Sequence, residues 1–517
     1  MKEIDVSKRT IGVNFNEQNE AEIIVWSPIA EQVAIVFNKE QIELDKEDFG
    51  YWHAQSNKLQ AGSQYKFLLN GKDQYPDPAS LSQPDGVHES SKAIDLKKFH
   101  WTDTDWNNLP LEDYIIYELH IGTFTPAGTF AAIEEKLDHL VSLGITAIEI
   151  MPVAQFPGNR NWGYDGVFPF AVQNSYGSAE GLQHLVNACH QKGLAVILDV
   201  VYNHLGPEGN YLGAFGPYFT DKYKTPWGNA INFDDAWCDG VRRYFIENAL
   251  MWFRDFHIDA LRLDAVHAIK DFSPVHILRE IKQYIDKLMQ ATGRRHYLIV
   301  ESDLNDNRFI NSLQKGGYGM DAQWIDEFHH ALRVTATKEQ TGYYSDFSGI
   351  EDLAKAYKDA YVYDGQFSPH RKKAFGIKTE NEGKQFIVFS QNHDQVGNRM
   401  LGERTSRLIS FEMQKLLAAA VVVSPYLPML FMGEEWSEPN AFLYFVSHTD
   451  KDLSEAVRKG RKKEFAAFHI QGEAPDPVSE ESFLRSKIQW NLIEEGEHKI
   501  MLQYYKALIQ LRKTNEV

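Results

Sequence analysis

From residue 113 onward the chain alternates short apolar runs with longer amphipathic segments. Eight such runs occur, at residues 114–121, 147–153, 195–201, 260–266, 297–302, 322–326, 386–394 and 429–435. Continuous apolar runs separated by segments of helical length are typical of parallel strands covered by helices. Eight of them predict an α/β fold, a closed (β/α)8 barrel of the TIM type. The alternative is an open doubly wound sheet, but the sequence lacks the glycine-rich phosphate turn that is usual in that fold.

Residues 1–95 follow a different pattern. Short runs of alternating polarity, such as 21–27 and 31–37, are interrupted by turn formers that include Pro28, Gly50 and Gly62. This pattern favours an antiparallel β-sandwich. The following segment is rich in Asp, Asn and Trp, which is typical of a linker. We therefore predict a sandwich at 1–95, a linker at 96–112, and the barrel with its terminal helices at 113–517.

Four acidic residues come near the ends of predicted barrel strands. They are Asp199 in the third run, Asp264 in the fourth, Glu301 in the fifth and Asp394 in the seventh. One acid at a strand end often belongs to an ion pair or a helix cap. Because the carboxyl ends of barrel strands meet at one rim, four such carboxylates predict a functional site there.

The fourth run also carries a buried cation candidate. Arg262 and Asp264 are two residues apart, so their side chains lie on the same face of a strand. They could simply neutralise each other in the core, since an unpaired buried charge is costly. Several carboxylates converging at the same point would instead raise the pKa of one of them, which is useful for acid–base chemistry.

Two carboxyl groups, one ionised and one protonated, are the minimum equipment for cleaving a glycosidic bond. Trp162 and Tyr164, in a loop after the second run, offer flat apolar faces for sugar rings, although each could equally serve packing. The formal net charge of -19 opposes binding to nucleic acid or to an anionic membrane and fits a neutral substrate.

Four segments resemble, in order and content, the signature regions of the α-amylase superfamily of glycoside hydrolases: DVVYNH (199–204), LRLDAVHA (261–268), IVES (299–302) and QNHD (391–394). The resemblance implies a barrel and a double displacement that retains the anomeric configuration. It implies that Asp264 is the nucleophile, Glu301 the general acid/base and Asp394 the carboxylate that holds sugar hydroxyls. Arg262 would orient and ionise Asp264.

The same resemblance implies a set of further substrate-binding residues: Tyr164, Asp199, Asn203, His204, Arg262, His267 and His393. In related amylases the asparagine of YNH helps to bind calcium. The sequence has no additional acidic cluster that demands an ion, so we expect no metal and no cofactor.

Longer segments, such as MPVAQFPGNRNWGYDGV and YNHLGPEGNYL, are similar to those of the malto-oligosyltrehalose trehalohydrolase family. That family cleaves the α-1,4 bond next to the terminal trehalose of maltooligosyl trehalose. His267 stands where many amylases have lysine, and it is expected to face the leaving sugars. The chain stops at Val517 in a helical segment, where members of the family continue into a C-terminal β domain, so we expect that domain to be missing or severely shortened.

Three other functions remain open at this point. A glycogen-branching enzyme would use a glucan hydroxyl in place of water, and a plain α-amylase would prefer uncapped maltooligosaccharides. A catalytically silent glucan-binding protein would normally have lost one of the three acids. The first ten residues contain charges where a signal peptide needs an apolar core, which predicts a cytoplasmic protein. The negative net charge predicts no nucleic acid or membrane partner. The oligomeric state stays undetermined.

Overall fold

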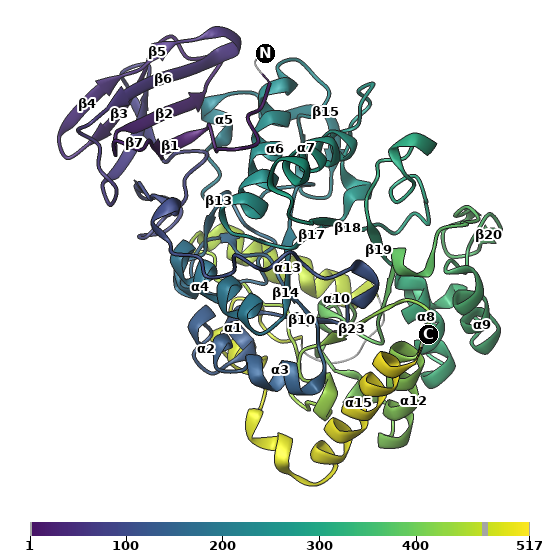
Figure 1. The fold of residues 1–517 in the computed structure, drawn as a ribbon. Coiled ribbons are helices and arrows are strands. Elements are labelled where there is room, and N and C mark those ends of the chain that lie inside the picture. Colours follow the sequence, from purple (N-terminus) through teal and green to yellow (C-terminus); the bar gives the residue numbers. More distant parts are fainter. Residues whose placement is uncertain (1–2, 468–473, 516–517) are drawn as a thin grey trace.

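Eight parallel strands close into a barrel at the centre of the molecule in the computed structural model, which describes residues 3–467 and 474–515 (Figure 1). The strands are β10 (Ile116–Leu119), β11 (Ala147–Ile150), β14 (Ala195–Val200), β17 (Ala260–Leu263), β18 (Tyr297–Glu301), β19 (Ala322–Trp324), β22 (Phe386–Val388) and β23 (Leu427–Phe431). They pair in sequence order, and β23 pairs in parallel with β10 to complete the ring. Each of the eight apolar runs contains or overlaps one strand, so the predicted fold class is confirmed.

Strand alternation divides the inside of the barrel into two layers. Ile116, Ala147, Ile197, Ala260 and Ile299 belong to one buried apolar cluster. Two residues further along each strand, on the same face, stands an ionisable side chain: Glu118, Glu149, Asp199, Arg262 and Glu301. The barrel therefore has an apolar floor and a charged upper layer at the carboxyl ends of its strands.

The seventh strand is shorter than predicted. It ends at Val388, and the chain then turns into α10 (His393–Gly397). The side chain of Asn392 caps this helix by accepting a hydrogen bond from the backbone N–H of Gln395 at 2.8 Å. Asp394 therefore stands in the first turn of a helix rather than at the end of a strand.

Helices cover the outside of the barrel. The longer ones that cover its wall are α4 (Ser178–Gln191), α6 (Cys238–Asp255), α7 (Ile277–Thr292), α8 (Asp326–Thr337), α12 (Phe411–Val422) and α15 (Gly496–Thr514). In α7 the buried positions Ile277, Leu278, Ile281, Ile285 and Leu288 recur at helical spacing, and Gly293 ends the helix in a left-handed conformation. None of the described helices is both long enough and apolar enough to cross a bilayer.

Two antiparallel sheets precede the barrel and lie to one side of it (Figure 1). The first has the order β1 (Gly12–Phe15), β2 (Ala21–Trp26), β6 (Tyr51–Ser56) and β5 (Asp45–Lys46); the second has β4 (Glu40–Glu43), β3 (Val33–Phe37), β7 (Gln64–Leu69) and β8 (Asp73–Tyr75), with β9 (Ser91–Lys92) also on β7. Trp26 of the first sheet packs against Tyr218 of the barrel domain in an edge-to-face arrangement, with the ring centres 5.0 Å apart. The predicted boundaries at residues 95 and 112 remain predictions.

Candidate active site

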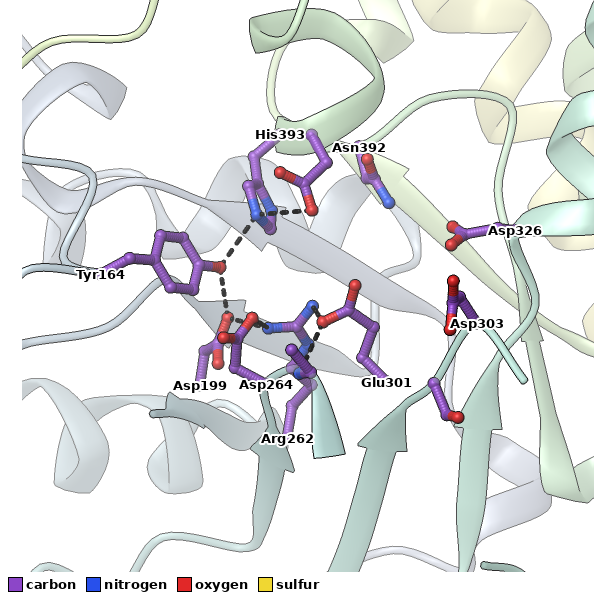
Figure 2. Close-up of polar contacts among 12 residues, drawn as sticks. Tyr164, Asp199, Arg262, Asp264, Glu301, Asp303, Asp326, Asn392 and His393 are labelled. Carbon is purple, nitrogen blue, oxygen red and sulfur yellow. Dashed lines mark hydrogen bonds and ion pairs between the residues drawn. The ribbon is translucent and has the colours of Figure 1, made fainter. Parts of the chain in front are cut away.

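Arg262 lies at the centre of the charged layer and is fully buried. Its Nη1 donates to Asp199 at 2.7 Å and to Asp264 at 2.9 Å, and its Nη2 is 2.9 Å from a carboxylate oxygen of Glu301 (Figure 2). One guanidinium therefore contacts three of the four predicted rim carboxylates. The opposite charges offset the cost of burying an arginine, which is the reason that β17 and the residue directly after it can carry two ionic side chains.

Asp264 follows directly after β17 and is held from two sides. Arg262 binds its Oδ1, and the amide of Asn203 donates to its Oδ2 at 2.8 Å and to its backbone oxygen at 2.7 Å. Asn203 comes from the loop after β14, so two strand ends fix one carboxylate. Asp264 is only 9% exposed, and the two donors stabilise its ionised form.

Glu301 is the last residue of β18 and is half-buried. Its Oε2 accepts a hydrogen bond from the backbone N–H of Ala265 at 2.8 Å. Ala265 adopts a left-handed conformation with φ of 40°, which is uncommon for a residue other than glycine. Burial raises the pKa of Glu301, while Arg262 opposes the rise. A carboxyl group with a raised pKa suits a proton donor.

A second chain of hydrogen bonds crosses the site from Glu118 to Asp199. Burial alone would lower the pKa of His393, but the carboxylates of Asp394 and Glu118 raise it to about 10. The protonated ring donates to Glu118 through Nδ1 and to the Tyr164 hydroxyl through Nε2, at 2.9 Å in the latter case. Tyr164 in turn donates to Asp199 at 2.6 Å. Burial raises the pKa of Asp199 to about 7, against the opposing effect of Arg262.

His204 belongs to the wall on the same side as Tyr164. Its Nε2 contacts the backbone oxygen of Tyr164 at 2.9 Å, and its Nδ1 contacts the side chain of Asn203. The indole of Trp227 stacks on the His204 ring, with centres 4.2 Å apart and planes within 6°. Trp227 lies in the turn of the hairpin β15 (Phe219–Thr225) and β16 (Gly228–Ile231), and it is 49% exposed. It gives the site an open aromatic face.

Asp394 and His267 lie at two other points of the rim. Asp394 is close to His393, with 3.5 Å between Oδ2 and Nε2. His267 is half-buried, and its Nε2 is 3.7 Å from Asp303 in the loop after β18. The structure thus brings the predicted site residues to the carboxyl end of the barrel, while their individual roles remain predictions.

Next to Glu301 the rim opens into a cavity of about 410 Å³. Asp394 lines it, together with Ser302 and Asp303, which follow Glu301 in the sequence. Trp324 forms part of its wall. The cavity falls within the size range of small-molecule sites and adjoins the carboxylates.

Three further residues of the site, Glu118, Glu149 and Trp324, were not among those predicted from the sequence. Trp324 lies beneath Arg262, with the guanidinium carbon 4.1 Å from the ring centre. Glu149 is buried, and neither of its carboxylate oxygens has a hydrogen-bond partner among the described residues. Burial and the neighbouring Glu118 raise the pKa of Glu149 well above its usual range. Both glutamates lie within apolar runs, at the third position of β10 and of β11, and an acid inside such a run is the signal that could have revealed them.

Within residues 3–467 and 474–515, no three or more His, Cys, Asp or Glu side chains are arranged to hold a metal ion. The side chain of Asn203, the position associated with calcium in related amylases, donates to Asp264 and contacts Nδ1 of His204.

The α-amylase catalytic-domain model matches residues 75–224, and the model of carbohydrate-binding module 48, the isoamylase N-terminal domain, matches residues 10–84. The malto-oligosyltrehalose trehalohydrolase of Saccharolobus solfataricus is 47% identical over 504 residues, 97% of this chain and 85% of that protein. A branching enzyme of Bacillus cereus is 26% identical, covering 95% of this chain and 72% of its own. A Salmonella typhimurium crystal structure with the provisional name alpha amylase has a TM-score of 0.93 and 38% identity, covering 98% of this chain and 87% of that one.

A closed barrel with a rim of carboxylates around a buried arginine, together with these matches, defines a glycoside hydrolase of the α-amylase family. Two malto-oligosyltrehalose trehalohydrolases, from Saccharolobus solfataricus and Arthrobacter ramosus, are 47% and 43% identical to it over 97% and 95% of this chain. The chain belongs to the malto-oligosyltrehalose trehalohydrolase family.

Proposed function

We propose that this chain hydrolyses the α-1,4-glucosidic bond next to the terminal trehalose of maltooligosyl trehalose and releases free trehalose. One observation carries the proposal. Asp264 and Glu301, from neighbouring strands, contact the two terminal nitrogens of the same Arg262 guanidinium at the rim of the barrel. Two carboxyl groups held by one cation support the pair of one ionised and one protonatable group that a retaining glycosidase requires.

In the first step Glu301 donates its proton to the glycosidic oxygen while Asp264 attacks the anomeric carbon. Trehalose leaves, and a covalent glycosyl-enzyme remains. In the second step Glu301, now ionised, takes a proton from water, and the hydroxide formed displaces Asp264 from the anomeric carbon. The raised pKa of Glu301 supports its role as the acid, and the donors from Arg262 and Asn203 support an ionised Asp264.

The residues around these two carboxylates bind and orient the sugar at the cleavage point. Tyr164 offers an aromatic face, which the hydrogen bonds to Asp199 and His393 hold in position. Asp394 accepts hydrogen bonds from sugar hydroxyls, while His204 and Asn203 shape the wall of the sugar-binding site. Arg262 keeps Asp264 ionised and aligned. His267, near Asp303, faces the sugars of the leaving group.

Product analysis tests this function directly. The protein is incubated with maltotriosyl trehalose and with maltopentaose, and the sugars released are identified and timed. We expect free trehalose and maltotriose from the first substrate, at a rate well above the cleavage of the second. Faster cleavage of maltopentaose would identify a plain α-amylase, and new α-1,6 branches in amylose would identify a branching enzyme. Absence of glycosidase activity on all of these substrates would favour a silent glucan-binding protein.

A further inference from the structure

The cavity beside Glu301 has a wall rich in hydrogen-bonding groups. Asp303, Asp326, His330 and Tyr343 line it, and Trp324 and Phe347 add aromatic surface. A lining of this kind suits a compact molecule with many hydroxyl groups. Two of its lining residues, Asp303 and Asp326, lie beyond Glu301 on the side away from Tyr164 (Figure 2). Since Glu301 protonates the departing oxygen, the leaving sugar belongs on this side.

Asp326 stands in this wall at the first position of α8, two residues after the end of β19. Its carboxylate lies on the same side as Asp303, beyond Glu301 (Figure 2). In the described part of the chain, its one hydrogen bond comes from Nε2 of Gln395 to Oδ1 at 3.3 Å. Among the described residues no donor reaches its second carboxylate oxygen, and Asp326 is part of the cavity lining.

A purely structural role does not account for this carboxyl group. An acid in the first turn of a helix is stabilised by the helix dipole, and an exposed acid gains this stabilisation without being desolvated. Asp326 is half-buried and has other carboxylates nearby, from Glu301, Asp303 and Asp394. The described residues provide no salt bridge to it. A poorly paired carboxyl group that faces a cavity next to a proton donor points to ligand binding.

We propose that Asp326 is a substrate-binding residue that holds a hydroxyl group of the leaving trehalose unit beside Glu301 and so determines specificity for that unit. This inference rests on the proposed function, which supplies the leaving sugar. It assigns Asp326 to recognition of the leaving group, with no part in the covalent step.

The protonation of Asp326 fits this role. Burial, followed by repulsion from Glu301, Asp394 and Asp303, raises the pKa of Asp326 to about 8. At neutral pH the side chain is therefore a carboxylic acid that can both donate and accept a hydrogen bond. An uncharged group at this position also avoids placing another negative charge beside the proton that Glu301 must deliver. The amide of asparagine has the same size and also donates and accepts.

Two substrates separate recognition of the leaving group from the rest of catalysis. The leaving group of maltotriosyl trehalose is trehalose, which occupies the cavity. The leaving group of α-maltotriosyl fluoride is a fluoride ion, which makes no contact with the cavity wall. For Asp326→Ala we expect kcat/KM on maltotriosyl trehalose to fall about 10- to 100-fold, because a buried hydroxyl loses its partner. On the fluoride, kcat/KM stays within about 3-fold of the wild type, which also shows that the variant is folded. Asp326→Asn retains most of the activity on both.

Inhibition by trehalose provides a readout that does not depend on cleavage of the capped substrate. With α-maltotriosyl fluoride as the reporter, the inhibition constant of trehalose rises at least about 10-fold in Asp326→Ala. Glu351→Ala is the matched control, because Glu351 is an exposed acid in the first turn of the neighbouring helix α9 (Ile350–Asp359). That variant behaves as the wild type in both assays.

Equal losses on both substrates, or an unchanged inhibition constant, would overturn the assignment of Asp326. Failure of the proposed function is seen separately, because the wild type itself would then release no trehalose from the capped substrate, and the inference would fall with it.

Discussion

The guanidinium carbon of Arg262 lies 4.1 Å from the centre of the Trp324 indole ring, and the edge of the same group contacts Asp199, Asp264 and Glu301. A planar cation can stack on a ring and still direct its nitrogens at carboxylates in its own plane. The Trp324 ring thus holds the guanidinium in one orientation. The guanidinium in turn sets the relative positions of Asp264 and Glu301, the two carboxylates proposed to carry the chemistry.

Replacing Arg262 by Lys keeps the positive charge but removes the planar guanidinium with its separate N–H donors. We expect Arg262→Lys to lower kcat on maltotriosyl trehalose at least about 100-fold, because one ammonium cannot hold carboxylates on both sides at once. Arg407→Lys, at an exposed arginine that donates to the backbone oxygen of Pro439, serves as the control and keeps full activity. Turnover of Arg262→Lys within 3-fold of the wild type would show that this alignment is unnecessary.

Replacing Glu301 by Gln removes the proton donor and keeps the shape of the side chain. We expect kcat to fall about 100- to 10,000-fold, with substrate affinity changed little, because the lost proton transfer belongs to the transition state. Single-turnover kinetics and isothermal titration with maltotriosyl trehalose measure the two quantities. A variant with near-normal turnover would exclude Glu301 as the acid/base.

The stereochemistry of the released maltotriose tests the double displacement. We expect the carboxyl groups of Asp264 and Glu301 to be roughly 5 to 5.5 Å apart, as in retaining glycosidases, rather than roughly 6.5 to 9.5 Å as in inverting ones. Proton NMR during the first minutes of reaction should then show the α-anomer appearing before mutarotation. Initial formation of the β-anomer would mean direct attack by water and would remove Asp264 as a nucleophile.

The charge on His393 predicts how stability depends on pH. Histidine has an ordinary pKa of about 6.5, and Asp394 and Glu118 raise the pKa of His393 to about 10. The stabilisation from its protonated form is complete below pH about 6.5 and is lost as the pH rises through about 10. We expect His393→Gln to lower the free energy of unfolding by about 3–5 kcal/mol at pH 7 and by much less at pH 10. Urea unfolding at the two pH values measures this difference, and an equal loss at both would mean that His393 is neutral.

The contact between the sandwich and the barrel depends on a glycine. A Cβ on Gly240, in the first turn of α6, would lie 2.1 Å from Cε2 of Trp26. We expect Gly240→Ala to destabilise the protein by about 1–3 kcal/mol through overpacking. A Cβ on Gly460, in helix α13 (Lys451–Ala467), would instead meet no atom within 4 Å. Gly460→Ala should therefore stabilise its helix by about 0.5–1 kcal/mol. Thermal unfolding of the two variants distinguishes these effects, and equal melting temperatures would contradict close packing at Trp26.

Much of the architecture was accessible from local patterns. Apart from the two end residues of β18, the barrel strands are buried, so each appears in the sequence as an apolar run, and an acid at the end of such a run is conspicuous. For the same reason Asp199, Asp264 and Glu301 were located to within one residue of a strand end. The end of the seventh strand was misjudged, because the cap at Asn392 turns the chain into α10 before Asp394 is reached.

Contacts between distant segments followed no local rule. Glu118 and His393 are 275 positions apart, and their hydrogen bond exists only because β10 and the segment after β22 reach the same rim. Asp326 is the last residue of the sixth apolar run in the sequence, but the structure places it in the first turn of α8, and only the cavity in front of it gives it a candidate role. The sequence by itself determined which elements form and which acids stand at their ends, because hydrophobic periodicity and strand alternation are local. Closure of the barrel decided which charges meet, how far each pKa shifts and where a sugar can enter, because those quantities depend on distances in space that no local pattern encodes.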